Sequence, residues 1–315
     1  MVRVFWLVIV LVAGRVESGE RVLAAAGETE VAPHGAGNVY APEMVESGGR
    51  RVLFYGGQGR DGHDRIHAAV EGKDGKWERR GVVFDPPGLN HVNDPSVVVV
   101  GGEWYMFYTR AAVGVTDTIG LATSRDGMKW EDAGTVLGPS AAPAWDALLV
   151  GRPSVCYEAG VFRMWYDGRK DLPEGAPDAA APKSANSRRW VGYATSKDGR
   201  VWKKHGDPVF GEDAGGVQVT KGPDGGMVMV YESVEGTRWA ASADGLVWKA
   251  CGLLVAKGNG AADASGHVTP FLEWRGGKAE LYFGAAAAAT WDRNEIWRET
   301  VGAERLRAGK PAEKD

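Results

Sequence analysis

The sequence predicts an all-β fold, a five-bladed β-propeller whose blades are four-stranded antiparallel sheets. Three near-copies of one motif carry this prediction, SRDGMKW at 124–130, SKDGRVW at 196–202 and SADGLVW at 242–248. Together with Trp77 and Trp297 they supply five tryptophans that lie 46 to 72 residues apart. A period near ~45 residues with four strand-like runs in each unit is typical of propellers.

Every repeat opens with two strand-like runs joined by a glycine-containing turn. The five copies are APEMVESGGRRVLFY from Ala41, DPSVVVVGGEWYMFY from Asp94, RPSVCYEAGVFRMWY from Arg152, VQVTKGPDGGMVMVY from Val217 and TPFLEWRGGKAELYF from Thr269. A third strand, an Asp-Gly turn and a fourth strand with tryptophan complete each unit. We therefore expect Trp77 to Trp297 to occupy equivalent places on successive blades.

The order of strands predicts which residues reach the central funnel. In an antiparallel hairpin the start of the first strand lies beside the end of the second. Asp94 therefore shares one mouth of the propeller with the residues after Tyr108, and Arg152 shares it with Asp167. The SxDGxxW turns fall at the opposite end, where Asp-Gly turn chemistry and tryptophan packing predict a structural role.

Composition is that of one large domain, which we place at residues 27–315. The chain has 315 residues, of which 44% are hydrophobic and 25% are charged, enough to bury a sizeable core. A formal net charge of −4 and an isoelectric point near 5.9 leave no basic surface for nucleic acid. Two cysteines are too few for a disulfide framework, so we expect free thiols. We also expect a monomer.

The N-terminus resembles an export signal. Arg3 precedes an apolar run from Val4 to Ala13, which is short for a membrane span and suited to a signal-peptide core. We place the signal peptide at about residues 1–26, with cleavage after Ser18 or between Leu23 and Ala26. A secreted or periplasmic protein that leaves the membrane after cleavage is expected, with a retained anchor as the alternative.

The repeats resemble a known superfamily. Five meander blades, the Asp-Pro of HVNDPSV at 91–97 and acidic residues at the same mouth are similar to the five-bladed glycoside hydrolases of families 43, 32 and 130. The resemblance covers most of residues 36–300 and implies a carbohydrate-active enzyme with an oligosaccharide or polysaccharide substrate. The DGxxW turns also resemble the Asp-boxes of sialidases, in which the glycine lies one residue further on.

Hydrolysis of a glycosidic bond needs two carboxyl groups, one protonated and one ionised. Asp94 matches the Asp that family 43 enzymes place in blade two, and we assign it as base or as modulator of the acid. Glu232 is predicted to be the general acid and Glu43 the second carboxylate. The family's blade-one position aligns with Ala41, and its blade-three position with Arg152, so its full triad is not reproduced. Because Pro follows, Asp94 is expected to be extended.

The predicted substrate-binding residues also lie at strand ends and loops of this mouth. They are Arg152, Asp167, Arg169, His267, Trp145, Asp146 and Asn93. Asp64 and Asp213 are expected in loops that border the mouth. Residues 168–190 form a long insertion, either a lid over the funnel or a disordered surface segment.

Two other functions remain open at this point. In a glycan phosphorylase, Arg152, Lys170 and His267 would bind phosphate. In a non-catalytic carbohydrate-binding propeller, the mouth carboxylates would all be tied to Arg and Lys. No cofactor and no catalytic metal site are predicted, while a central structural ion such as calcium is left open.

Overall fold

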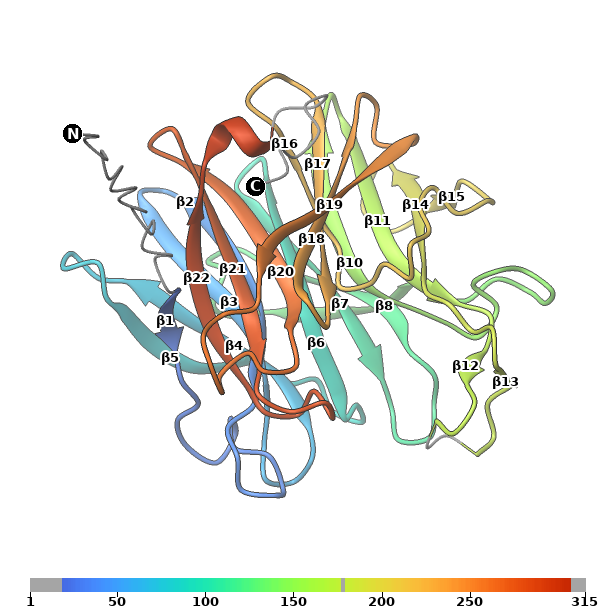
Figure 1. Cartoon of the computed structure of the whole chain (residues 1–315), viewed down its shortest axis with the longest axis horizontal. Helices are drawn as coiled ribbons and strands as arrows, with labels where there is room; N and C mark the ends of the chain where they lie inside the picture. Colours follow the sequence, from blue (N-terminus) through green and yellow to red (C-terminus); the bar gives the residue numbers. More distant parts are fainter. Residues whose placement is uncertain (1–18, 177–178, 307–315) are drawn as a thin grey trace, which may run out of the picture.

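Four antiparallel strands in chain order form each of the first four predicted repeats (Figure 1), and a single pairing between Ser233 and His267 joins the fourth repeat to the fifth. The computed structural model describes residues 19–176 and 179–306. Blade 1 consists of β2 (Val39–Ser47), β3 (Arg50–Gln58), β4 (Asp64–Glu71) and β5 (Trp77–Phe84). Blade 2 consists of β6 (His91–Val100), β7 (Glu103–Ala111), β8 (Thr118–Ser124) and β9 (Glu131–Leu137).

Blades 3 and 4 follow the same plan with shorter edges. Blade 3 consists of β10 (Leu149–Glu158), β11 (Val161–Arg169), β14 (Trp190–Ser196) and β15 (Lys203–Lys204). Blade 4 consists of β16 (Gln218–Lys221), β17 (Met227–Ser233), β18 (Gly236–Ser242) and β19 (Trp248–Ala256). Strands β12 (Leu172–Pro173) and β13 (Lys183–Ser184) form a small parallel pair inside the insertion of blade 3.

Blade 5 takes its outer strand from the other end of the chain. Its order is β20 (His267–Arg275), β21 (Lys278–Ala286), β22 (Asn294–Val301) and β1 (Glu20–Leu23). Figure 1 shows β1 beside β22. Trp297 consequently lies in the third strand of its blade, whereas Trp77 and Trp248 begin fourth strands. The predicted equivalence of Trp297 is wrong because the N-terminal strand occupies the fourth place.

The strand β1 also bears on the predicted signal peptide. Cleavage after Ser18 preserves this strand, whereas cleavage between Leu23 and Ala26 removes it from the sheet. Residues 1–18, which include the apolar run, lie outside the described residues.

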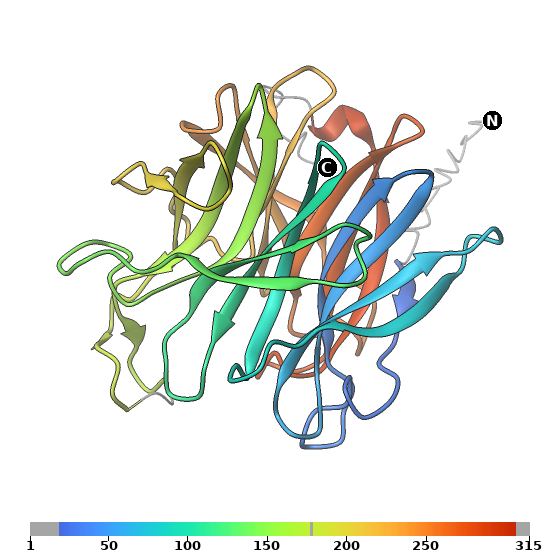
Figure 2. The same ribbon diagram turned by 180° about the vertical axis from the view of Figure 1, so that it is seen from behind.

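The five inner strands close into a ring around a central channel. Contacts link β2 to β6, β6 to β10, β10 to β16, β16 to β20 and β20 back to β2. Viewed from behind in Figure 2, the first blade (blue) lies beside the last (red). The predicted five-bladed propeller is therefore confirmed. No helix among the described residues is long and apolar enough to cross a membrane.

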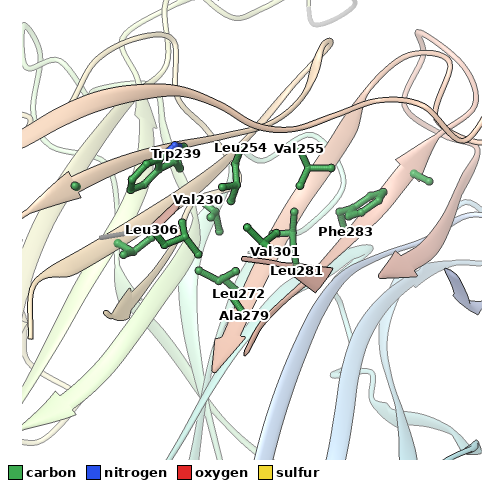
Figure 3. Packing of buried hydrophobic residues seen from close by; sticks show 13 residues of the cluster. Val230, Trp239, Leu254, Val255, Leu272, Ala279, Leu281, Phe283, Val301 and Leu306 are labelled. Atoms are coloured by element: carbon green, nitrogen blue, oxygen red, sulfur yellow. The ribbon is translucent and has the colours of Figure 1, made fainter. Parts of the chain in front are cut away.

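A hydrophobic cluster fills each of the five interfaces between neighbouring blades. Figure 3 shows the cluster between blades 4 and 5, where Val230 and Trp239 meet Leu272, Leu281 and Phe283. The other four join blades 1 and 2, 2 and 3, 3 and 4, and 5 and 1. Apolar burial at about 25 cal/mol per Å² makes these interfaces the main source of stability. Blade 5 receives Leu23 of β1 in its cluster with blade 1.

The SxDGxxW turns repeat one set of hydrogen bonds. Ser196 Oγ accepts from Gly199 N at 2.9 Å, and Asp198 Oδ1 accepts from the next two backbone N–H groups at 2.8 and 2.9 Å. The copies at 124–130 and 242–248 make the same three bonds. These backbone N–H groups hold the pKa of each turn aspartate below its usual value. The structural interpretation of the motif fits this geometry.

Candidate active site

The funnel is built on one backbone irregularity that recurs in every inner strand. Four inner strands carry a bulge at a residue that precedes proline and has a positive φ; these residues are Ala41 (51°), Asp94 (49°), Arg152 (47°) and Thr269 (42°). Gly216, with φ 57°, holds the place in blade 4. Proline lacks an N–H, so the ladder loses no donor at the bulge. The predicted extended conformation of Asp94 is wrong, since the bulge turns it left-handed.

These five residues line the central pocket together with the two that follow each of them. Residues of the second strands lie beside them, in the pairings Tyr40 with Gly56, Asn93 with Thr109, Gly151 with Asp167 and Val268 with Gly284. Glu232 is the penultimate residue of β17, the second strand of blade 4. Blades 1 and 5 therefore present small or neutral groups at these two positions, and blades 2 to 4 present the charges.

The charged groups of blades 2 to 4 are Asp94, Arg152, Asp167 and Glu232, which we call the charged arc. Arg152 occupies its centre. Its Nη1 lies 3.3 Å from Asp167 Oδ2 and its Nε lies 4.0 Å from Asp94 Oδ2. Burial alone would lower the Arg152 pKa, but Asp167, Asp94 and Glu232 together raise it. The guanidinium is therefore a fixed positive charge, and its side chain remains 34% exposed toward the funnel. The sequence-based pairing of Arg152 with mouth acids is present in the structure.

Glu232 is held by a cation that the sequence analysis did not identify. Arg189 donates through Nη1 to Glu232 Oε1, and the Thr269 backbone N–H donates to Oε2 at 3.2 Å. Gly216 is required here, because a Cβ at that position would lie 2.5 Å from Glu232 Oε2. Arg189 ends the long insertion, and the only signal for it was the pair of arginines just before the strand at Trp190.

The three carboxyl groups of the arc have unlike pKa values. Burial raises the pKa of Asp94, and the charges of Arg152 and His91 offset this only in part. Burial also raises the pKa of Asp167, to about 6. Burial would raise that of Glu232 as well, but Arg189 and Arg152 bring it below the usual value. The site therefore makes Asp94 harder to ionise than an ordinary aspartate and favours the ionised form of Glu232.

Asn93 belongs to a second polar network between blades 1 and 2. It donates to Tyr40 Oη at 2.9 Å and lies 2.7 Å from His91 Nε2. Tyr40 donates to Asp64 Oδ1 at 2.8 Å, and His91 Nδ1 lies 2.9 Å from Asp117 Oδ1. Burial lowers the His91 pKa, but Asp117 and Asp64 outweigh it and raise the pKa to about 9. Asp94 thus lies between two cations, His91 and Arg152.

Arg169 lies at the rim, two residues beyond Asp167 on the same face of β11. Its Nη1 donates to Ser187 Oγ at 3.3 Å, and Ser187 donates in turn to the Asp171 carbonyl at 2.6 Å. The insertion is thereby attached to the mouth at this point. Whether it acts as a lid stays a prediction.

Glu43 lies two residues after the bulge residue Ala41, one step deeper in the channel. Its Oε1 accepts from the Val97 backbone N–H of blade 2 at 2.9 Å. The equivalent side chains make the same link to the next blade; they are Ser96 to Val155, Ser154 to Val219 and Gln218 to Leu272. Burial raises the Glu43 pKa to about 8. This pattern is that of a link between inner strands rather than of a second reacting carboxylate.

His267, Trp145 and Asp146 do not line the funnel. His267 is fully buried, stacks on Phe283 at 3.7 Å, and has a pKa that burial lowers to about 4. Asp146 is 1% exposed and pairs with Lys204 Nζ at 2.6 Å. Trp145 donates to the Gly206 carbonyl at 2.8 Å and stacks on Tyr166. The partners of all three side chains belong to neighbouring strands and loops, so these residues hold those elements together.

Metal ligands are not clustered in the part of the chain that the structure describes. No group of three or more His, Cys, Asp or Glu side chains is arranged there to hold a metal ion. The two cysteines, Cys156 and Cys251, are free thiols.

Solved structures with the same architecture are glycoside hydrolases. One, described as a glycoside hydrolase, superposes with a TM-score of 0.70 at 20% identity and covers 94% of this chain and 96% of its own. A family-130 member from work on hydrolases that target β-1,2 mannosidic linkages in Candida mannan has a TM-score of 0.62 at 16% identity, covering 94% and 96%. A thermostable family-43 glycoside hydrolase has 0.61 at 15% identity, covering 84% and 88%. The chain shares the fold of the five-bladed glycoside hydrolases.

Sequence comparisons add two relatives. Mycobacterium tuberculosis proteins described as Uncharacterized protein MT1551 (strain CDC 1551 / Oshkosh) and Uncharacterized protein Rv1502 (strain ATCC 25618 / H37Rv) are each 28% identical over 258 residues. The match covers 74% of this chain and 81% of each relative. No family model matches the chain. The predicted resemblance to families 43 and 130 is confirmed at the level of fold, and the reaction rests on the side chains of the mouth.

Proposed function

We propose that this propeller hydrolyses glycosidic bonds at the mouth of its funnel. The observation that supports the proposal is the pair of oppositely shifted carboxyl groups, Asp94 raised and Glu232 lowered, on either side of Arg152. Two carboxyl groups with separated pKa values are what acid and base assistance to glycoside cleavage requires.

The electrostatics suggest roles that differ from those first predicted. Asp94 is buried and its pKa is raised, which suits the donor of a proton to the leaving oxygen. Glu232 favours its ionised form beside Arg189 and suits the base or nucleophile, the opposite of the predicted general acid. Asp167 is 1% exposed and fixes Arg152, so we assign it a positioning role.

The phosphorylase alternative receives less support from the geometry. Of the three residues predicted to bind phosphate, Arg152 lines the funnel, His267 is buried away from it, and Lys170 is exposed beyond the rim. The binding-only alternative gains some support, since Asp167 and Glu232 both pair with arginine. Asp94, whose nearest Arg152 nitrogen is 4.0 Å away, is the carboxyl group that favours catalysis.

The experiment that separates these functions is a substrate screen with purified protein. Aryl glycosides and plant or microbial oligosaccharides are incubated with and without inorganic phosphate, and released sugars are quantified. Turnover independent of phosphate is expected. Turnover only with phosphate would make the protein a phosphorylase, and binding without any turnover would make it a lectin-like propeller.

Export is part of the same proposal. An apolar run behind Arg3, followed by a strand at Glu20–Leu23 that completes blade 5, supports removal of a signal peptide after Ser18. Mass spectrometry of the mature protein from an extracytoplasmic fraction should find Gly19 at its N-terminus. A full-length protein retained with membranes would support the anchor instead.

A further inference from the structure

Three arginines converge where blades 3 and 4 meet at the mouth. Arg152 comes from the inner strand of blade 3, Arg169 from the end of its second strand, and Arg189 from the end of the insertion. The charges of Arg189 and Arg152 disfavour that of Arg169, and the charge of Arg152 disfavours that of Arg189. Like charges gather in this way at sites for an anion, because proteins otherwise separate them.

Two of the three cations form ion pairs within the protein. Arg152 pairs with Asp167 at 3.3 Å, and Arg189 pairs with Glu232 and lies 3.9 Å from Asp213. Arg169 has no carboxylate within ion-pair distance among residues 19–176 and 179–306, and its guanidinium donates to the neutral Ser187 hydroxyl. Burial, together with Arg189 and Arg152, lowers its pKa. Asp213 and Asp167 offset this only in part from a longer range. A half-buried guanidinium without an ion-pair partner is costly, and a bound anion would remove that cost.

The position of Arg169 indicates which kind of anion fits. It lies at the rim, beyond Asp167 along β11, whereas Asp94 and Arg152 line the central pocket. A phosphate that attacks the sugar must reach the reacting carbon between Asp94 and Glu232. An anion at Arg169 is displaced from that centre, as a charged substituent of the substrate would be.

We propose that Arg169, supported by Arg189 and Arg152, binds a carboxylate carried by the sugar, so that the substrate class is a glycuronic acid or an oligosaccharide that contains one. The inference rests on the proposed function for its site and names the substrate of that site. Planar guanidinium groups bind carboxylates through paired hydrogen bonds that neutral sugars cannot replace.

Binding to the full-length protein tests this without requiring turnover. Glucuronic and galacturonic acids are compared with glucose, galactose and inorganic phosphate by calorimetry at low salt. The uronic acids should bind at least ~10-fold more tightly than their neutral counterparts, as expected for a charge-assisted contact. Raising the salt concentration should weaken that preference.

Matched variants assign the contact. Arg169→Gln should remove the preference, Arg169→Lys should restore part of it, and Lys170→Gln, which removes one exposed charge from the next residue, should leave it intact. Melting temperatures close to that of the wild type confirm that the variants are folded. Retention of the preference in Arg169→Gln, equal binding of neutral sugars, or binding of phosphate alone would overturn the proposal.

The result is separable from the proposed reaction. Uronic acid binding through Arg169 without cleavage of any glycoside would refute hydrolysis and leave this inference standing. Cleavage of neutral glycosides without a preference for uronic acids would do the reverse.

Discussion

The two ends of the propeller treat the same repeat differently. At the end opposite the funnel, blades 2, 3 and 4 carry the same turn with the same three hydrogen bonds. At the mouth the five inner strands share one backbone conformation but carry Ala41, Asp94, Arg152, Gly216 and Thr269. Repetition therefore marks what the ring needs in order to fold, and divergence on a repeated backbone marks where the chemistry lies.

Removing the carboxyl group at the divergent end should have the largest effect on function. Asn tolerates the left-handed backbone of Asp94, so Asp94→Asn should shift the melting temperature by only a few degrees. Turnover should fall by at least ~10²-fold, as expected for lost acid assistance. Steady-state kinetics and thermal melting check this. Unchanged turnover, or a collapse of stability with intact ligand affinity, would make Asp94 a structural Asp-Pro turn and remove the hydrolase assignment.

The pH dependence sharpens the same contrast. The raised pKa of Asp94, the assigned acid, predicts that turnover falls as the pH rises through that pKa. The lowered pKa of Glu232 predicts a second decline only at low pH. A rate profile over the acidic and neutral range measures both limbs. An optimum well above neutral pH would contradict the assigned protonation states.

The stability contributed by the mouth should also decrease as the pH rises. A raised folded-state pKa means that the Asp167 contribution is fully present below its unfolded value near ~3.9 and is lost as the pH rises through about 6. The turn aspartates have lowered pKa values, so their contribution is present above ~3.9 and is lost only on further acidification. Thermal melts across this range measure the difference in melting temperature between Asp167→Asn and the wild type, which should change between pH 4 and 7.

The interface between blades 5 and 1 can be weakened from the N-terminal strand β1. Leu23 is 4% exposed in the cluster between blades 5 and 1, so Leu23→Ala should cost about 2–5 kcal/mol in the free energy of unfolding. Arg21→Ala, at a side chain 57% exposed on the same strand, serves as the control and should cost little. Denaturant titration measures both. Equal, small effects would show that β1 does not stabilise the interface between blades 5 and 1.

The smallest effect is expected at the repeated turns. Replacing Asp126, Asp198 or Asp244 by Ala removes two backbone hydrogen bonds in each case and should lower the melting temperature by about 2–4 °C. The three losses should match one another, and turnover at room temperature should be unaffected. A loss of turnover from any one of them would overturn the division of the molecule into a structural end and a functional end.

The sequence predicted the ring because its signals are local and repeated. Hairpin alternation and the Asp-Gly turns fix each blade, and antiparallel pairing places Asp94, Arg152, Asp167 and Glu232 at one mouth. The strand β1 was missed because its partner β22 lies more than 270 residues away, a distance that no periodicity reports. Trp297 was misplaced for the same reason.

Side-chain direction limited the prediction of the site. Glu43 follows the bulge at Ala41, and the direction of its side chain depends on a backbone conformation that residue types alone do not specify. His267, Trp145 and Asp146 border the mouth in sequence but turn between strands toward Thr237, Tyr166 and Lys204. Arg189 reaches Glu232 from an insertion whose shape follows no repeat.

The central claim is that Glu232 acts as the ionised carboxylate of a glycosidase, and one measurement tests it most directly. Turnover of Glu232→Ala is followed on a dinitrophenyl glycoside, whose leaving group needs no proton, with and without sodium azide. Because this substrate needs no acid assistance, it reports the loss of the base or nucleophile alone. We therefore expect turnover to fall at least ~10²-fold and to recover when azide occupies the space between Arg189 and Arg152. Full activity of the variant on this substrate, or a folded, inactive variant that azide does not rescue, would contradict the account.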